Sequence, residues 1–135
     1  MASQPVRFEC VFPVTNEDID DLGHVNNVVY LRWVQDVAAA HWQSATTPIE
    51  RADVAWVVLR HEIDYKHPAK SGDAVVARTW VGPPVAARFE RHTEIVRVAD
   101  GRVLAQARSL WCPVNPKTGR VLRIDPALHD RFYTT

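Results

Sequence analysis

One short segment of the sequence gathers side chains that could carry out acid–base or nucleophilic chemistry. Residues 20–27 read Asp-Asp-Leu-Gly-His-Val-Asn-Asn, which places carboxylates, an imidazole and two amides just before an apolar, helix-like run. The first turn of a helix has backbone N–H groups without intrahelical partners, and the macrodipole makes that end electropositive. A carboxylate beside such an end, with free N–H groups to hold a carbonyl oxygen, is suited to hydrolytic acyl transfer.

The same segment resembles a known signature. Asp20 to Tyr30 fits the pattern Asp-x-x-Gly-His-Val-Asn-Asn-x-x-Tyr, which is similar to the signature of hotdog-fold acyl thioesterases of the 4-hydroxybenzoyl-CoA thioesterase-like superfamily. Its His-Val-Asn-Asn-x-x-Tyr portion is also similar to plant-type acyl-carrier-protein (acyl-ACP) thioesterases. Downstream, residues 63–73 resemble the strand, Pro and Gly-Asp turn of the same superfamily.

The resemblance implies a catalytic role for one of three neighbouring acids. The acid of the family stands three residues before the Gly, which selects Asp20 rather than Asp18 or Asp21, and it acts as nucleophile or as general base for water. A helix-start carboxylate that stabilises the positive helix end is the structural alternative for all three. With Asp20 as the acid, we expect Asp18→Asn to be nearly silent.

The residues after the acid are expected to position the substrate. The backbone N–H groups of Val25 to Asn27 are the predicted oxyanion hole, and Gly23 allows a tight turn and a close backbone approach to a ligand. His24 either acts in catalysis or substrate positioning, or makes a structural hydrogen bond that holds the loop. Asn26 and Asn27 are expected to serve as helix cap and loop support.

Other candidate ligand-binding residues are few. Arg88 and Arg91 lie on a strand-like segment and could contact the phosphates of coenzyme A; a solvated strand face is the alternative. The six His and two Cys residues show no metal-ligand spacing, so we expect no metal site. No phosphate-binding loop, nucleophilic-serine elbow or dinucleotide fingerprint occurs, so we expect no cofactor, and coenzyme A enters as part of the substrate.

The composition narrows the class of protein. Sixteen basic and sixteen acidic side chains cancel, so no bulk field favours nucleic acid or an anionic membrane. No apolar run approaches the ~20 residues of a membrane span, and Met1–Pro5 lack the basic and apolar regions of a signal peptide. Cys10 and Cys112 fall in strand-like runs, where we expect buried, reduced thiols. These observations predict a cytoplasmic protein.

Hydrophobic periodicity indicates the elements that must position the candidate residues. From Asn27 to about Gln43 apolar residues recur at intervals of three and four, and nearly every face is apolar, so we expect a helix buried on all sides with Tyr30 packed in the core. Strands are expected at 6–14 before the helix and at 54–66, 74–81, 87–98 and 103–114 after it. In the second strand, the alternation puts four residues on one face: Leu59, His61, Ile63 and Tyr65.

One helix followed by a run of strands with hairpin turns predicts a single α+β domain, residues 1–135, with an antiparallel sheet. The resemblance implies a hotdog fold, in which the sheet wraps around one long central helix. The predicted function is hydrolysis of an acyl-CoA to free acid and CoA. The alternatives are an acyl-ACP thioesterase and a non-catalytic hotdog protein that binds acyl thioesters.

The small size of the chain and its open sheet edge predict a homodimer with each active site built across the subunit boundary. The resemblance implies the same arrangement, often with two dimers joined as a homotetramer. The expected ligand is an acyl-CoA or acyl-carrier-protein thioester.

Overall fold

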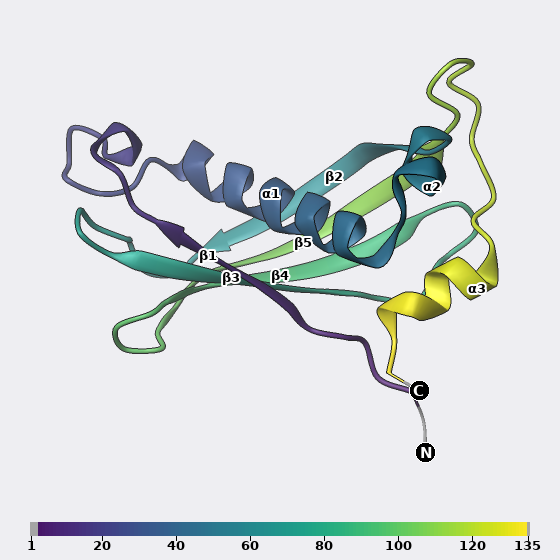
Figure 1. Cartoon of the computed structure of the whole chain (residues 1–135). Helices are drawn as coiled ribbons and strands as arrows, with labels where there is room; N and C mark the ends of the chain where they lie inside the picture. The colour runs from purple at the N-terminus through teal and green to yellow at the C-terminus, as the bar shows by residue number, and fades with distance from the viewer. Residues whose placement is uncertain (1–2, 135) are drawn as a thin grey trace.

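The computed structural model describes residues 3–134 and shows an antiparallel sheet crossed by one long helix (Figure 1). Within these residues, five strands lie in the order β1-β3-β4-β5-β2, and every neighbouring pair is antiparallel. The elements are β1 (Phe8–Pro13), η1 (Asn16–Asp18), α1 (Asn27–Ala45), α2 (Pro48–Ala52), β2 (Ala55–Tyr65), β3 (Ala74–Val81), β4 (Phe89–Arg97), β5 (Val103–Val114), α3 (Pro126–His129) and η2 (Asp130–Phe132). The predicted α+β class, with a sheet around one long helix, is confirmed.

The helix α1 begins where its sequence provides a cap. The side chain of Asn26 accepts a hydrogen bond from the Val28 N–H at 3.1 Å, which satisfies one of the donors left open in a first helical turn. Asn27 is the first residue inside the helix. Asn26 therefore has the capping role that the sequence indicates.

One face of α1 packs on the sheet, and the opposite face is open to solvent. The buried residues recur at intervals of three and four: Val29, Tyr30, Trp33, Val34, Val37, Ala38 and His41. Val28 is 68% exposed, and Gln35, Asp36 and Ala39 are exposed as well. The expectation of a helix buried on all sides is wrong for the single chain, because one sheet can cover only one side of a helix.

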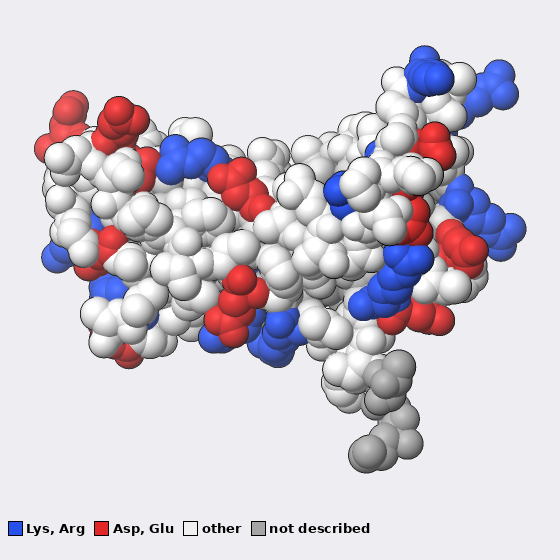
Figure 2. Space-filling model, in the orientation of Figure 1, with Lys and Arg blue, Asp and Glu red and all other residues white. Residues whose placement is uncertain are grey.

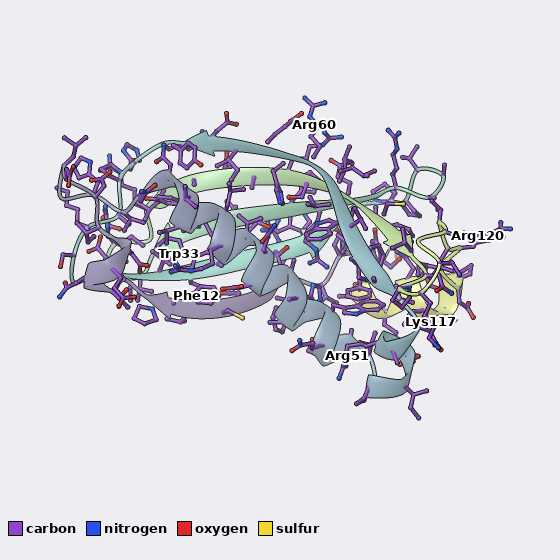
Figure 3. The ribbon with its side chains drawn as sticks, turned by 90° about the horizontal axis from the view of Figure 1, so that it is seen from above. Phe12, Trp33, Arg51, Arg60, Lys117 and Arg120 are labelled. Carbon is purple, nitrogen blue, oxygen red and sulfur yellow. The ribbon has the colours of Figure 1, made fainter. Side chains whose placement is uncertain are left out.

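The core lies between α1 and the three central strands. Trp33 of the helix and Ile95 and Leu104 of β4 and β5 are each at most 1% exposed. The Trp33 ring also stacks with Phe12 of β1, with 6.4 Å between centroids, and both are labelled in Figure 3. Full burial of large apolar side chains of this kind stabilises the fold by roughly 1.5–3 kcal/mol each, so this contact fixes α1 across the sheet.

The edge strand β2 contains a one-residue bulge. Val58 pairs with Trp111 and Arg60 pairs with Leu110, which leaves Leu59 as an extra residue. Leu59 is 50% exposed, whereas the predicted face would have it share the environment of half-buried His61 and Ile63. The prediction of one continuous face over 59–65 is therefore wrong at Leu59, because the bulge interrupts the two-residue period.

The two ends of the described chain lie side by side, as Figure 1 shows. The Val6 N–H donates to the Phe132 carbonyl at 2.8 Å. Residues 1, 2 and 135 lie outside the described residues. All three belong to the predicted domain, and residues 1 and 2 also belong to the N-terminal segment that we expect to lack a signal peptide. Within residues 3–134 no helix combines the length and apolar character needed to cross a membrane.

The two cysteines differ in their surroundings. Cys112 is buried at 8% exposure, as predicted, whereas Cys10 on the edge strand β1 is only half-buried. Burial, and secondly the negative charge of Asp36, raises the pKa of the Cys10 thiol. Both cysteines are free thiols.

Candidate active site

The loop that enters α1 is closed around the carboxylate of Asp20. Its Oδ1 atom accepts the backbone N–H of Leu22 at 2.9 Å and that of His24 at 3.2 Å. A backbone hydrogen bond also joins the two sides of this loop, because the Asp20 N–H donates to the His24 carbonyl at 2.8 Å. No partner for Oδ2 is found among residues 3–134. The loop therefore holds the carboxylate by one oxygen and leaves the other available.

Gly23 gives this loop its shape through its backbone conformation. Its φ is +78°, in the left-handed region that residues with a Cβ rarely adopt. A Cβ built at this position would meet no atom within 4 Å. The structure thus assigns Gly23 the tight turn, and it shows no close approach of another part of the described chain.

Fewer backbone N–H groups are available for the predicted oxyanion hole than the sequence indicates. The Val25 N–H donates to the Ala69 carbonyl at 2.9 Å, and the Asn26 N–H donates to the Asp18 carbonyl at 2.8 Å. Of the three predicted donors, only the Asn27 N–H lacks a partner within residues 3–134. Because Asn27 opens the helix, this N–H points along the electropositive end of α1. The prediction of Val25 and Asn26 as donors is corrected, because the fold already uses both N–H groups.

The second motif of the sequence packs against the first. His24 and Lys70 form an antiparallel bridge, so the turn of residues 66–73 lies beside the Asp20 loop. The buried hydroxyl of Tyr30 accepts the Ala69 N–H at 2.9 Å. The carbonyl of Ala69 in turn accepts the N–H of Val25. Tyr30 is 3% exposed, which confirms its predicted place in the core. Burial raises the pKa of its phenol, so it stays protonated at neutral pH.

Asp18 has a larger structural role than the sequence reveals. It is 2% exposed, and its carboxylate accepts the Thr15 N–H at 2.9 Å and a guanidinium N–H of Arg32 at 2.9 Å. Burial alone would raise the pKa of Asp18, but the hydrogen bond from Thr15 and the charge of Arg32 outweigh it and lower the pKa. Asp18→Asn is therefore a poor neutral control. Asp21, which is exposed, suits that purpose.

The backbone of His24 makes the hydrogen bonds that hold the loop, and its side chain does not. The hydrogen bonds that hold the loop involve its N–H and its carbonyl. No hydrogen bond of its half-buried imidazole is found among residues 3–134. The loop-holding alternative is thus accounted for by the main chain, which leaves the ring free for a ligand.

The two arginines predicted as phosphate contacts face different environments. Arg88, just before β4, is exposed, whereas Arg91 is 8% exposed and lies on the inner side of the strand. The Nη1 atom of Arg91 donates to His41 Nδ1 at 3.0 Å and to Thr79 Oγ1 at 3.1 Å. The alternative of a solvated strand face is wrong for Arg91, because strand alternation turns its side chain into the interior, and the phosphate contacts of both arginines stay a prediction.

On the face shown in Figure 2, charged side chains do not single out a binding surface. In Figure 2, Lys and Arg are interspersed with Asp and Glu, and acidic side chains gather at the end that carries the loop before α1. Within residues 3–134 no three His, Cys, Asp or Glu side chains are arranged to hold a metal ion. The polar groups that distinguish the Asp20 loop are therefore one carboxylate oxygen, one backbone N–H and one imidazole.

Solved structures share this fold. The 1,4-dihydroxy-2-naphthoyl-CoA thioesterase from Synechocystis superposes with a TM-score of 0.81 at 19% identity, covering 94% of this chain and 96% of that one. The probable thioesterase YbaW from Escherichia coli gives 0.80 at 20% identity, with 92% and 95% covered. A Staphylococcus aureus protein solved in complex with CoA gives 0.83 at 17% identity, with 94% and 82% covered. These neighbours establish the hotdog fold.

Sequence relatives include plant enzymes that are much longer. Oleoyl-acyl carrier protein thioesterase 2 of Arabidopsis thaliana is 28% identical over 109 residues, which is 73% of this chain and 29% of that protein. An acyl-[acyl-carrier-protein] hydrolase of Cuphea viscosissima is 30% identical over 74 residues, 55% of this chain and 18% of its own length. The chain thus spans less than a third of either relative. A sequence profile matches from residue 14 to residue 132, across the Asp20 loop, α1 and the strands behind it, and by this match the chain belongs to the thioesterase-like superfamily.

Proposed function

We propose that this protein hydrolyses an acyl-CoA to the free acid and CoA. Two groups without partners in the described residues carry the proposal: the Oδ2 atom of Asp20 in the loop before α1, and the N–H of Asn27, the first residue of that helix. Two backbone hydrogen bonds hold the carboxylate in place, so little reorganisation is needed when a substrate arrives. Membership of the thioesterase-like superfamily supports the same chemistry.

The reaction needs a nucleophile and a site for negative charge. In the general-base route, Asp20 takes a proton from water while the water oxygen bonds to the thioester carbon. The carbonyl oxygen becomes an oxyanion held by the Asn27 N–H, and collapse of this intermediate breaks the C–S bond. The CoA thiolate then takes up the proton. In the nucleophilic route, Asp20 itself attacks, the thiolate leaves, and water hydrolyses the resulting anhydride. Both routes need the carboxylate and no metal or cofactor.

Asp20→Asn tests this role with little structural change. The amide oxygen can still accept the N–H groups of Leu22 and His24, whereas the group that replaces Oδ2 can neither take a proton nor attack. We expect the rate of thioester hydrolysis to fall on the order of 100-fold or more, with an unchanged melting temperature. Asp21→Asn, one residue away and exposed, is the matched control and should be silent. Near-normal turnover by Asp20→Asn would exclude the carboxylate from the mechanism.

His24→Ala separates catalysis from loop support. Since the loop hydrogen bonds use the main chain of His24, loss of the ring should lower turnover by about 10-fold while stability is kept. A parallel fall of stability and turnover would assign the ring to loop support instead.

A second candidate substrate is an acyl-ACP, because the plant relatives carry that name. The two substrates share the acyl thioester and the phosphopantetheine arm and differ in what lies beyond it. Hydrolysis rates for matched acyl-CoA and acyl-ACP pairs, with aromatic, short and long acyl groups, distinguish them. We propose CoA as the carrier, and a preference for the ACP thioester of the same acyl group would reverse that assignment.

The working unit is proposed to be at least a homodimer. In the single chain, β2 is an unpaired edge strand whose Val57 and Leu59 are 45% and 50% exposed, and the outer face of α1 is uncovered. A two-fold interface would cover both surfaces and complete the substrate site. Light scattering with activity measured on dilution is the test. A monomer that keeps full specific activity at nanomolar concentration would contradict the shared site.

A further inference from the structure

A cavity of about 250 Å³ lies under the second half of α1, away from the Asp20 loop. On the helix its lining runs from Gln35 to Trp42, about 12–22 Å along the axis from Asn27, toward the end marked by Arg51 in Figure 3. Five aromatic rings form much of its wall: Trp42, Trp56, Phe89, Trp111 and Phe132. They support one another, with Trp56 edge-on to Trp42 at 5.4 Å and to Phe89 at 5.3 Å. Such walls favour a flat apolar group.

Several polar atoms at this cavity have no partner in the described part of the chain. The indole Nε1 atoms of Trp56 and Trp111 are buried and unpaired there, and so is His129 Nε2. An indole N–H can only donate, and a buried donor without an acceptor costs about 1–3 kcal/mol. Both indoles belong to side chains that line the cavity, so a ligand whose acceptor atoms reach them would satisfy these donors.

Arg91 adds a buried positive charge to the same wall. Its guanidinium donates through Nη1 to His41 and Thr79, both uncharged partners, and no carboxylate within residues 3–134 lies at ion-pair distance. Burial, and secondly the charge of Arg91, lowers the pKa of His41 to about 4, so His41 is neutral at pH 7. Burial lowers the pKa of Arg91 to about 10, which still leaves it charged. Buried charges are normally paired, so this one lacks its counter-ion.

Glu90, the acid next to Arg91 at the cavity, is paired with other residues. Its carboxylate pairs with Arg108 at 2.5 Å and with His92 Nε2 at 3.1 Å. The charge that remains without a partner at the cavity is therefore the guanidinium of Arg91.

We propose that this cavity binds an apolar carboxylate with a ring-sized body, its anionic end on Arg91 and the indole N–H groups and its ring against the aromatic wall. A carboxylate only accepts hydrogen bonds and matches the planar fork of a guanidinium. A cavity of about 150 Å³ holds a benzene ring, so the larger volume here fits a ring with a short carboxylate arm. The proposal is independent of the reaction proposed for Asp20.

Binding of 3-phenylpropanoate to the whole chain, compared with its neutral amide 3-phenylpropanamide, tests the inference without a variant. By titration calorimetry the acid should bind roughly 10- to 100-fold more tightly than the amide, as a charge-assisted pair requires. On binding, the indole N–H signals of Trp56 and Trp111 in ¹H–¹⁵N spectra should shift. Equal affinity for acid and amide, or no binding of either at millimolar concentration, would overturn the proposal.

Two variants locate the binding. Arg91→Met should weaken the acid roughly 10-fold or more and leave the amide unchanged, while Arg88→Met, an exposed neighbour, should alter neither. Trp111→Phe keeps a ring and loses one donor, so it should weaken the acid alone. Acid binding that is unchanged in a folded Arg91→Met would overturn the proposal, because the acid would then be held elsewhere.

The carboxylate could be a free acid or the far end of an acyl chain. Competition of 3-phenylpropanoate with acyl-CoA for turnover, through a raised KM, would identify the far end of an acyl chain. An unchanged KM with binding intact would identify a free acid; both results support the site. Loss of turnover in Asp20→Asn with acid binding preserved would show that the two proposals are separate.

Discussion

Removal of one hydroxyl, in Tyr30→Phe, should destabilise the protein more than its size suggests. This hydroxyl accepts the N–H of Ala69 at 2.9 Å, and both residues are buried, at 3% and 0% exposure. Phe would fill the same space, so no cavity is created. The Ala69 N–H, however, would be left in the core without an acceptor, because no water can reach a site of that exposure.

The magnitude follows from that unpaired donor. A buried N–H without a partner costs about 1–3 kcal/mol, and for a domain of 135 residues this corresponds to a fall in melting temperature of about 3–10 °C. Urea unfolding should show a lower midpoint with an unchanged slope, since the surface exposed on unfolding stays the same. Turnover should fall as well, because the carbonyl of the same residue, Ala69, accepts the N–H of Val25 at the entry to the helix.

Tyr65→Phe is the matched control. Its hydroxyl donates to the Asn27 carbonyl at 3.2 Å, and its ring meets Tyr30 edge-on at 5.4 Å, but Tyr65 is 44% exposed. Water can replace this bond, so the loss should stay below about 1 kcal/mol. Equal losses for the two variants, or a loss below about 0.5 kcal/mol for Tyr30→Phe, would refute the reasoning that burial decides the cost.

Two further perturbations test the electrostatics of the buried polar groups. Asp18→Asn should destabilise the fold by about 1–3 kcal/mol at pH 7, because it removes the negative charge beside Arg32 in a site that is 2% exposed; equal urea midpoints for variant and wild type would contradict this. The pKa of His41 is about 4 in the folded chain and near 6.5 in the unfolded chain. Between pH 4 and pH 6.5 the unfolded chain therefore binds a proton on His41 that the folded chain does not. Stability contributed by neutral His41 is therefore complete above pH 6.5 and should fall by about 3 kcal/mol as pH drops to 4. His41→Gln should remove that part of the pH dependence, and identical pH profiles would exclude it.

Much of the fold follows from local periodicity in the sequence. The strands at Ala74–Val81 and Val103–Val114 have the predicted bounds, because alternating side chains and Gly turns mark both of their ends. The edge strand β1 is shorter than predicted at each end. The helix begins at Asn27 as predicted, because Asn26 caps it, and it extends two residues further than predicted, to Ala45.

Local sequence patterns do not predict the features that depend on contacts between distant segments of the chain. Nothing local shows that Ala69 and Asp18 already accept the N–H groups of Val25 and Asn26, since both acceptors come from other segments. The inward orientation of Arg91 depends on the register of β4 within the sheet. One missed element did have a local signal: Thr47-Pro48-Ile49-Glu50 forms a capping box with Pro in the first turn, and it starts the short helix α2.

The extra residue at Leu59 makes the bend of β2 separable from its pairing. Without Leu59, Val58 and Arg60 would become consecutive and still face Trp111 and Leu110, so every other side chain would keep its side of the sheet. In Figure 3, β2 curves over the sheet near Arg60, beside the strand that carries the Trp111 wall of the cavity. Because a bulge bends the strand that carries it, a deletion of this one residue should straighten β2 and keep its pairing. Deletion of Leu59 should therefore alter the path of β2 beside the cavity while the residues that line the cavity stay the same.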